Sequence, residues 1–235
     1  MKKVKLYSLS LICLLLVAFT GCKKDYFINS GLHKAKYEGN MLQYLESQPF
    51  LFDTLIRVIK LAGVEKYFTD STMTFFAPAD STINRTYLYI NQQLKLSGAD
   101  TLTSLDNIKA EFWRSTLMMY MFSGARGLEE FQQLDLSNRS AFPGEYVRSM
   151  GGRVMNIGVT FGDASGLKYQ GYRQLNLAYI PNQSSPQQGW RITRIATSNI
   201  QPTNGYVHVL NYPAHYFGFD PDQAALNASY LGFNR

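Results

Sequence analysis

The segment at residues 74–80, Thr-Phe-Phe-Ala-Pro-Ala-Asp, constrains the fold more than any other stretch of the chain. Phe75 and Phe76 are consecutive, and consecutive side chains of a strand point to opposite faces of a sheet. Both faces must therefore be covered, as in a strand that lies inside a domain. Pro78 cannot donate to a strand ladder, and Asp80 or the serine after it can cap a following helix. The segment predicts a buried strand that leads directly into a helix.

A second informative segment begins at Asn204-Gly205 and continues as Tyr-Val-His-Val-Leu to residue 210. Asn-Gly is the dipeptide that best tolerates two consecutive positive φ angles, which a tight hairpin turn requires. We therefore expect a two-residue hairpin between strands at residues 191–200 and 206–210. In this strand His208 has a valine on each side.

The first 22 residues resemble a bacterial lipoprotein signal. Three lysines precede an apolar run at residues 9–19 that is too short for a typical membrane span, and the run ends in Phe-Thr-Gly-Cys. The resemblance implies that Cys22 carries lipid and anchors the chain to a membrane of the cell envelope, most simply the outer membrane. Either the periplasmic or the outer face of that membrane is compatible with the sequence. An ordinary secretory signal followed by a chance cysteine is the alternative.

Charge and cysteine content exclude two classes of protein. Three of the 23 basic residues lie in the predicted signal, which leaves 20 basic against 17 acidic residues, scattered along the chain. This small excess does not predict a nucleic-acid partner. Cys13 would leave with the signal and Cys22 would be acylated, so no disulfide is expected and stability must come from burial.

Apolar periodicity places the remaining elements along the chain. Three-and-four spacing predicts one or two helices from Met41 to Gly63, preceded by a tether, and further helices at residues 82–94 and from Asp106 to just before Gly124. After residue 127 short strand-like runs alternate with turns, at residues 145–150, 153–161, 173–180 and 191–200. No internal repeat is visible, which indicates one domain.

In this order, the elements and the two segments resemble the fasciclin-like (FAS1) domain over residues 50–216. The motif residues are Thr74, Phe75, Phe76, Ala77, Pro78 and Asp80 in the first segment and Asn204, Gly205 and His208 in the second. The resemblance implies an α+β fold, a β-sandwich or wedge with flanking α-helices in a single domain. It also implies a non-catalytic module for adhesion or matrix contact. The rest of the chain divides into the signal at 1–22, a tether and leading helix at 23–49, and a C-terminal tail at 217–235.

Two departures limit what the resemblance implies about partners. Many animal members carry Tyr-His after the central helix, where this chain has Tyr120-Met121, and an Asp-Ile pair where this chain has Asn199-Ile200. The animal mode of receptor binding is therefore not expected. The segment from His215 to Asp220 looks like the end of fasciclin-like lipoproteins of the Bacteroidetes type, whose genes tend to accompany glycan-uptake systems.

No residue set predicts catalysis, a cofactor or a metal site. His208 is interpreted as a hydrogen-bonded structural histidine, and neither His208 nor His215 has a neighbour at a zinc-ligand spacing. The stretch at residues 162–166 contains Asp163 and Ser165, but its spacing fits a hairpin loop better than a nucleophile elbow.

Aromatic residues near predicted loops are the candidate ligand contacts. Trp190, Tyr172 and Tyr179 could stack on a sugar or anchor a protein interface, and packing inside the sandwich is the alternative for each of them. Two functions follow: an envelope-anchored module that binds a surface protein or matrix polymer, or a carbohydrate-binding accessory of a glycan-uptake system.

Overall fold

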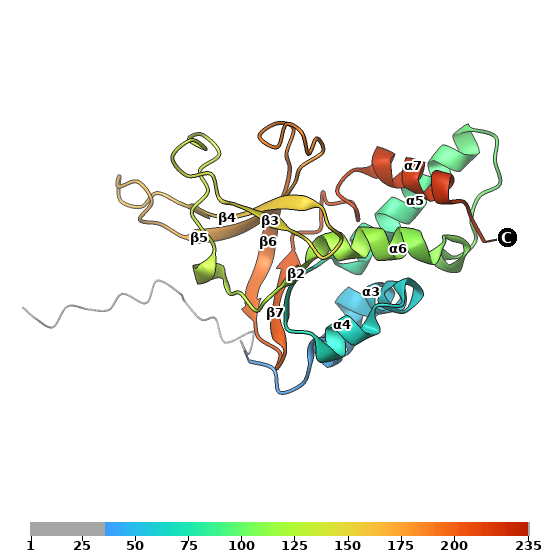
Figure 1. Cartoon of the computed structure of the whole chain (residues 1–235), viewed down its shortest axis with the longest axis horizontal. Helices are drawn as coiled ribbons and strands as arrows, with labels where there is room; N and C mark the ends of the chain where they lie inside the picture. Colours follow the sequence, from blue (N-terminus) through green and yellow to red (C-terminus); the bar gives the residue numbers. More distant parts are fainter. Residues whose placement is uncertain (1–35, 235) are drawn as a thin grey trace, which may run out of the picture. The chain divides into compact units, whose positions relative to one another are not determined.

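The computed structural model describes residues 36–234, which contain helices and one seven-stranded sheet (Figure 1). The α-helices are α2 (Met41–Glu46), α3 (Pro49–Ala62), α4 (Glu65–Asp70), α5 (Asp80–Leu96), α6 (Ala110–Leu117) and α7 (Pro221–Leu231). The strands are β1 (Met73–Ala77), β2 (Met121–Ser123), β3 (Glu145–Arg148), β4 (Val154–Phe161), β5 (Arg173–Tyr179), β6 (Arg191–Ile200) and β7 (Gly205–Leu210). Cys22 and the predicted signal lie outside the described residues. No helix of residues 36–234 is both long and apolar enough to cross a membrane.

The two motif segments form neighbouring strands of the sheet. The strand order is β2-β1-β7-β6-β5-β4-β3, and β1 pairs with β7 in parallel. Phe75 lies opposite Val207 and Phe76 opposite His208, and all four side chains are buried. The strand β1 is covered on both faces because the ring of Phe75 packs edge-on against Phe68 of α4, while Phe76 packs against other aromatic rings.

The α+β class is confirmed, whereas the sandwich is not. All seven strands belong to one hydrogen-bonded sheet, so the pairing does not divide them into two sheets. Strand β6 joins the two halves of this sheet, and its register with β7 shifts twice between Ile195 and Ile200. Such bulges bend a strand and increase its twist, which lets one sheet curve instead of splitting in two. Asn199, within the second shift, has a positive φ of 63°.

The helices gather beside β1, β2 and β7, whereas β4 and β5 extend away from them in Figure 1. The helix α3 ends at Gly63, as the sequence predicted. Gly63 adopts φ 62° and ψ 44°, a left-handed C-cap. The segment predicted as a C-terminal tail contains α7, which packs against α5 and α6. Its inward face consists of Ala224, Ala225 and Ala228, small side chains that allow close packing.

The predicted two-residue turn at Asn204-Gly205 is wrong. Residues 201–204 connect β6 to β7, Gly205 is already the first residue of β7, and Asn204 does not have a positive φ. The asparagine is instead a side-chain clamp, since its Oδ1 accepts from Met41 N at 2.8 Å and its Nδ2 donates to the carbonyl oxygens of Phe68 and Ser71. Gly205 has φ 148°, and a Cβ there would lie 1.9 Å from the carbonyl oxygen of Met73. Glycine is therefore needed for the close approach of β7 to β1.

Two predicted helix details are also corrected. The helix expected to run to Gly124 ends at Leu117, and residues 121–123 form the edge strand β2, which pairs with β1. Asp80 makes no cap bond to its own helix α5. Its Oδ1 accepts instead from the backbone N–H of Leu55 in α3 at 2.9 Å, so this motif residue links two helices.

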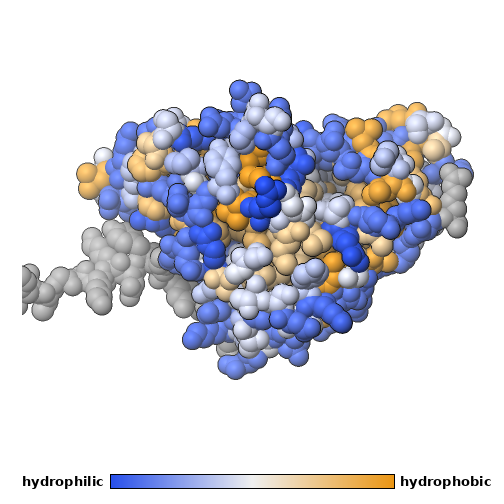
Figure 2. Space-filling view, in the orientation of Figure 1, coloured by the Kyte–Doolittle hydropathy of each residue, from blue (hydrophilic) through white to orange (hydrophobic). Residues whose placement is uncertain are grey.

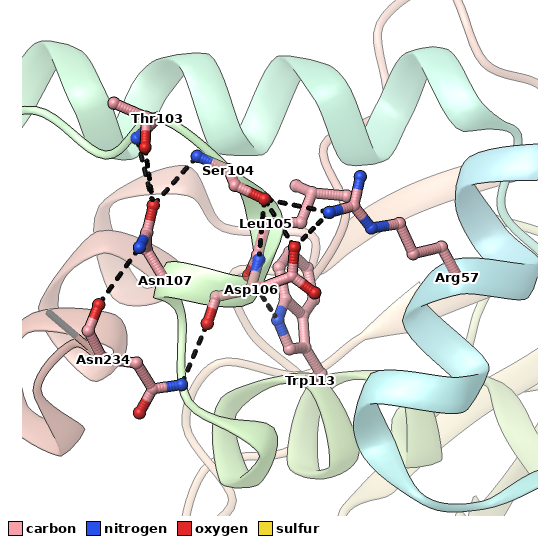
Figure 3. A network of polar contacts seen from close by, with 8 residues as sticks. All are labelled: Arg57, Thr103, Ser104, Leu105, Asp106, Asn107, Trp113 and Asn234. Carbon is pink, nitrogen blue, oxygen red and sulfur yellow. Dashed lines mark hydrogen bonds and ion pairs between the residues drawn. The ribbon is translucent and has the colours of Figure 1, made fainter.

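Asp106 was expected to cap α6. It belongs instead to a polar network that ties three segments together (Figure 3). Its carboxylate pairs with Arg57 of α3 and accepts from the hydroxyl of Ser104. The side chain of Asn107 donates to the carbonyl oxygen of Asn234, which holds the end of the described chain beside this turn. The network is largely exposed, so it orients these segments more than it stabilises them.

Candidate functional site

The motif histidine His208 is fully buried and has a partner on each ring nitrogen. Its Nδ1 accepts from the backbone N–H of Asn199 at 3.3 Å, and its Nε2 lies 3.0 Å from the carbonyl oxygen of Arg126. These partners assign a neutral ring with the proton on Nε2. Burial lowers the pKa of His208 to about 4. The ring is thus a structural link between β7 and neighbouring segments.

Asn199 holds the turn beside this histidine. Its Oδ1 accepts from the backbone N–H of Leu128 at 2.7 Å, and its Nδ2 donates to the carboxylate of Glu129 at 3.0 Å. Its left-handed backbone is a conformation that asparagine adopts more readily than most residues. The amide therefore fixes the segment after β2 against β6.

A second buried histidine centre escaped the sequence interpretation. The ring of His215 lies between Tyr120 and Thr193, with Nε2 2.9 Å from the Tyr120 hydroxyl and Nδ1 3.0 Å from Thr193 Oγ1. The Tyr120 hydroxyl also accepts from the backbone N–H of Gly218 at 2.7 Å. Tyr120 therefore donates to His215, and the neutral ring carries its proton on Nδ1. Burial lowers the pKa of His215 to about 3 and raises that of Tyr120.

This centre lies in an aromatic stack that closes the helical end of the sheet. Tyr120 stacks on Phe217 and Phe219 with centroid distances of 5.5 and 4.9 Å. Tyr179 continues the stack, 5.5 Å from Phe219. The prediction that Tyr179 contacts a ligand is therefore wrong, because its side chain is buried against Phe219 and lies under Arg153.

The other two aromatic candidates have different surroundings. Trp190 is half-buried, with the Arg139 guanidinium 4.7 Å from its ring centroid, and its indole N–H donates to the carbonyl oxygen of Pro186 at 2.6 Å. Tyr172 is 72% exposed and lies over Gly162, so it is free to contact a partner. Asp163 and Ser165 lie in the turn between β4 and β5, where Asp163 Oδ1 accepts from the backbone N–H of Tyr169. This turn is the hairpin loop that the sequence predicted.

Exposed apolar side chains gather on two neighbouring helices. Leu88 and Leu96 of α5 and Leu226 and Tyr230 of α7 are each at least 61% exposed. Figure 2 shows hydrophobic residues over this helical end of the molecule, interspersed with polar ones. Such mixed surfaces are common in proteins and do not by themselves define an interface.

Two hollows adjoin β6. The first, of about 650 Å³, is lined by residues of the segment 134–137, of β4 and of the β4–β5 turn, and the second, of about 600 Å³, by residues of the segment 211–221. Ile192 and Arg194 line both hollows. We call the combined feature the β6 groove. Among residues 36–234, no group of three His, Cys, Asp or Glu side chains is arranged to hold a metal ion.

Two comparisons with known proteins found similar proteins. The sequence profile described as the fasciclin domain matches residues 51–213. Among solved structures, the chain is similar to a FAS1 domain pair from the insect cell adhesion molecule fasciclin I, with 15% identity and a TM-score of 0.46 over 75% of this chain and 50% of that one. The match thus spans half the length of the insect structure, and no curated protein matches the chain. Because the fasciclin profile covers most of the described residues, and the two motif segments pair as neighbouring strands, the chain belongs to the fasciclin (FAS1) domain family.

Proposed function

We propose that the chain is a lipid-anchored, non-catalytic binding module of the bacterial cell envelope, of the fasciclin-like lipoprotein type, which contacts a surface protein or a matrix polymer. FAS1 domains are generally adhesion or binding modules. The observation that carries the proposal is the state of the motif histidine. His208 is buried, neutral and hydrogen-bonded on both ring nitrogens, so the motif pair supports a scaffold and leaves recognition to the surface.

The anchor rests on the lipobox-like end of the signal, Phe-Thr-Gly-Cys, at Cys22. The full chain, expressed in a Gram-negative host with a radioactive fatty acid, should become labelled and fractionate with the outer membrane. Cys22→Ser should abolish the label, and Cys13→Ser, within the apolar run, should leave it unchanged. Label that survives Cys22→Ser, or a wild-type chain in the soluble fraction, would rule out the lipid anchor.

The binding role is tested by capture from the envelope. The full-length protein, crosslinked in intact cells and purified in detergent, should recover a specific protein or polysaccharide that an unrelated lipoprotein of equal abundance does not. Recovery of nothing beyond that control would contradict the proposal. Protease treatment of intact cells would then show which face of the membrane the module occupies.

A second candidate, a carbohydrate-binding accessory of a glycan-uptake system, is favoured by the β6 groove. The groove presents exposed polar and apolar side chains together, which is the mixture that sugar-binding surfaces use. In this case the partner would be a polysaccharide.

A further inference from the structure

The β6 groove has two lobes that share two residues of one strand. Side chains of a strand alternate between faces, so Ile192 and Arg194 point outward from β6 while Thr193 and Ile195 are buried. Ile192 and Arg194 line both hollows, whereas Thr193, on the opposite face of the strand, lines only the second. A ligand in either lobe could therefore reach Arg194.

The first lobe contains a carboxylate held in one orientation. Asp135 Oδ1 accepts from the backbone N–H of Ser137 at 2.8 Å and from its hydroxyl at 2.6 Å, and Oδ2 accepts from the Tyr169 hydroxyl at 2.8 Å. These hydrogen bonds lower the pKa of Asp135 to about 2. A carboxylate offers about four lone-pair positions, so one acceptor position on Oδ2 remains for a ligand.

Several groups in this lobe have unused hydrogen-bonding capacity. Within residues 36–234, the guanidinium of Arg194, the ammonium of Lys168 and Oδ2 of Asp163 have no hydrogen-bond or ion-pair partner. Asn176 is only 3% exposed yet lines the lobe. Its Nδ2 donates to Gln174 O at 2.8 Å and to two further oxygens, whereas no donor of the described chain reaches its Oδ1. This amide oxygen is therefore a free hydrogen-bond acceptor at the wall of the lobe.

The second lobe is less charged. Arg191 pairs with Asp220 at 2.7 Å, which removes most of the free charge of both groups. Thr193 Oγ1 accepts the proton on His215 Nδ1, so its own hydroxyl hydrogen is available to another acceptor at the wall of the lobe. Tyr216 and Pro213 add apolar surface.

We propose that the β6 groove binds an uncharged glycan chain, with Arg194 contacting sugars in both lobes. The inference deepens the proposed function, because it names the ligand class of the binding module and the place where the ligand binds. A sugar hydroxyl donates and accepts, so it satisfies the free donors of Arg194 and Lys168 and the free acceptors of Asp163 and Asn176 at once. Ile192, 38% exposed, supplies an apolar surface for the C–H face of a ring. The two acidic and two basic groups of the first lobe balance, which disfavours a strongly charged polymer of either sign.

The test uses the full-length protein in detergent and four neutral hexasaccharides as probes: β-1,4-glucan, α-1,4-glucan, β-1,4-mannan and β-1,4-xylan. Isothermal titration calorimetry should detect binding of at least one. Arg194→Ala should weaken that binding about tenfold or more, and Asp163→Asn by a smaller factor. Lys95→Ala, an exposed lysine near the end of α5, is the matched control and should leave affinity unchanged. Circular dichroism and thermal melting of each variant establish that it is folded.

Three outcomes would overturn the inference. None of the four probes binds; a probe binds but Arg194→Ala has no effect; or only polygalacturonate, added as a charged probe, binds and is released by salt. If envelope capture recovers a protein partner whose binding is insensitive to Arg194→Ala, the groove inference fails while the proposed binding function stands. If capture recovers nothing and no probe binds, both fail.

Discussion

The two buried histidines should make this domain sensitive to mild acid. The pKa is lowered by burial to about 4 for His208 and about 3 for His215, against about 6.5 for a histidine in an unfolded chain. As pH falls from 7 to 5, the unfolded chain therefore binds protons that the folded protein does not, and folding stability decreases. At pH 5 each histidine costs about 2 kcal/mol, or about 4 kcal/mol for the pair, because each pKa unit corresponds to about 1.4 kcal/mol.

The structural reason is that neither ring can become charged without losing a hydrogen bond. A proton added to Nδ1 of His208 would face the backbone N–H of Asn199, and a proton added to Nε2 of His215 would face the Tyr120 hydroxyl, which already donates to it. Arg85 lies near His215 and further disfavours a positive ring. A loss of about 4 kcal/mol is large beside the 5–15 kcal/mol that typically stabilises a domain.

The assay is urea unfolding followed by tryptophan fluorescence at pH 7 and pH 5, since Trp113 is buried and reports on the core. This pH range lies above the values at which most carboxylates titrate, so the histidines dominate the change. The matched control is the double variant His208→Gln and His215→Gln, whose unfolding free energy should vary much less with pH. If the double variant does not fold, NMR titration of the wild-type histidine ring protons gives the same information.

A decrease in the wild-type unfolding free energy of less than about 1 kcal/mol between pH 7 and pH 5 would refute the reasoning. So would ring protons of either histidine that titrate near pH 6.5 in the folded protein. Either result would mean that water or a rearranged hydrogen bond accommodates the charged ring.

Three further substitutions test the packing. Gly205→Ala should lower the unfolding free energy by at least about 3 kcal/mol, because the new Cβ would clash with the backbone of β1. The control Gly98→Ala, also at positive φ but in open space, should lower it by only about 1 kcal/mol. Equal losses in urea unfolding would exclude the clash. Tyr120→Phe leaves two buried polar groups without their partner and should cost about 2–4 kcal/mol by the same measurement, and a loss below about 0.5 kcal/mol would contradict the hydrogen-bond assignment. Arg57→Ala removes an exposed ion pair and should change stability by less than about 1 kcal/mol, so a larger loss would show that the network in Figure 3 supports the core.

Local patterns in the chain were sufficient for most elements. The apolar periodicity before Gly63 predicted α3, since amphipathic spacing and a left-handed glycine act within a few residues. The end of α6 was misplaced because the apolar residues at 118–121 fit a continued helix as well as a strand. Residues 121–123 form a strand because Met121 pairs with Phe75 of β1, which is far away in the chain.

The interpretation of His208 as a structural residue could be reached locally, because the residue alternates with buried valines in a strand. Its hydrogen-bond partners, Asn199 and Arg126, could not be predicted from the local sequence, because they belong to other segments of the chain. The same holds for Tyr179, which was expected at a strand end near solvent but is covered by Phe219 from forty residues later. Exposure is a property of what packs on a side chain, and no spacing rule reports it.

The amino-acid order alone was enough to indicate most helices and strands, including the two motif strands, because periodicity, proline and glycine act on neighbouring residues. How the strands join into one curved sheet is set by the tertiary structure, which also builds the Tyr120–His215–Thr193 centre and the β6 groove. These features depend on contacts between residues far apart in the chain, such as the 95 positions between Tyr120 and His215. Such contacts are chosen by the collective fit of side chains in a packed interior, and only the folded chain brings them together.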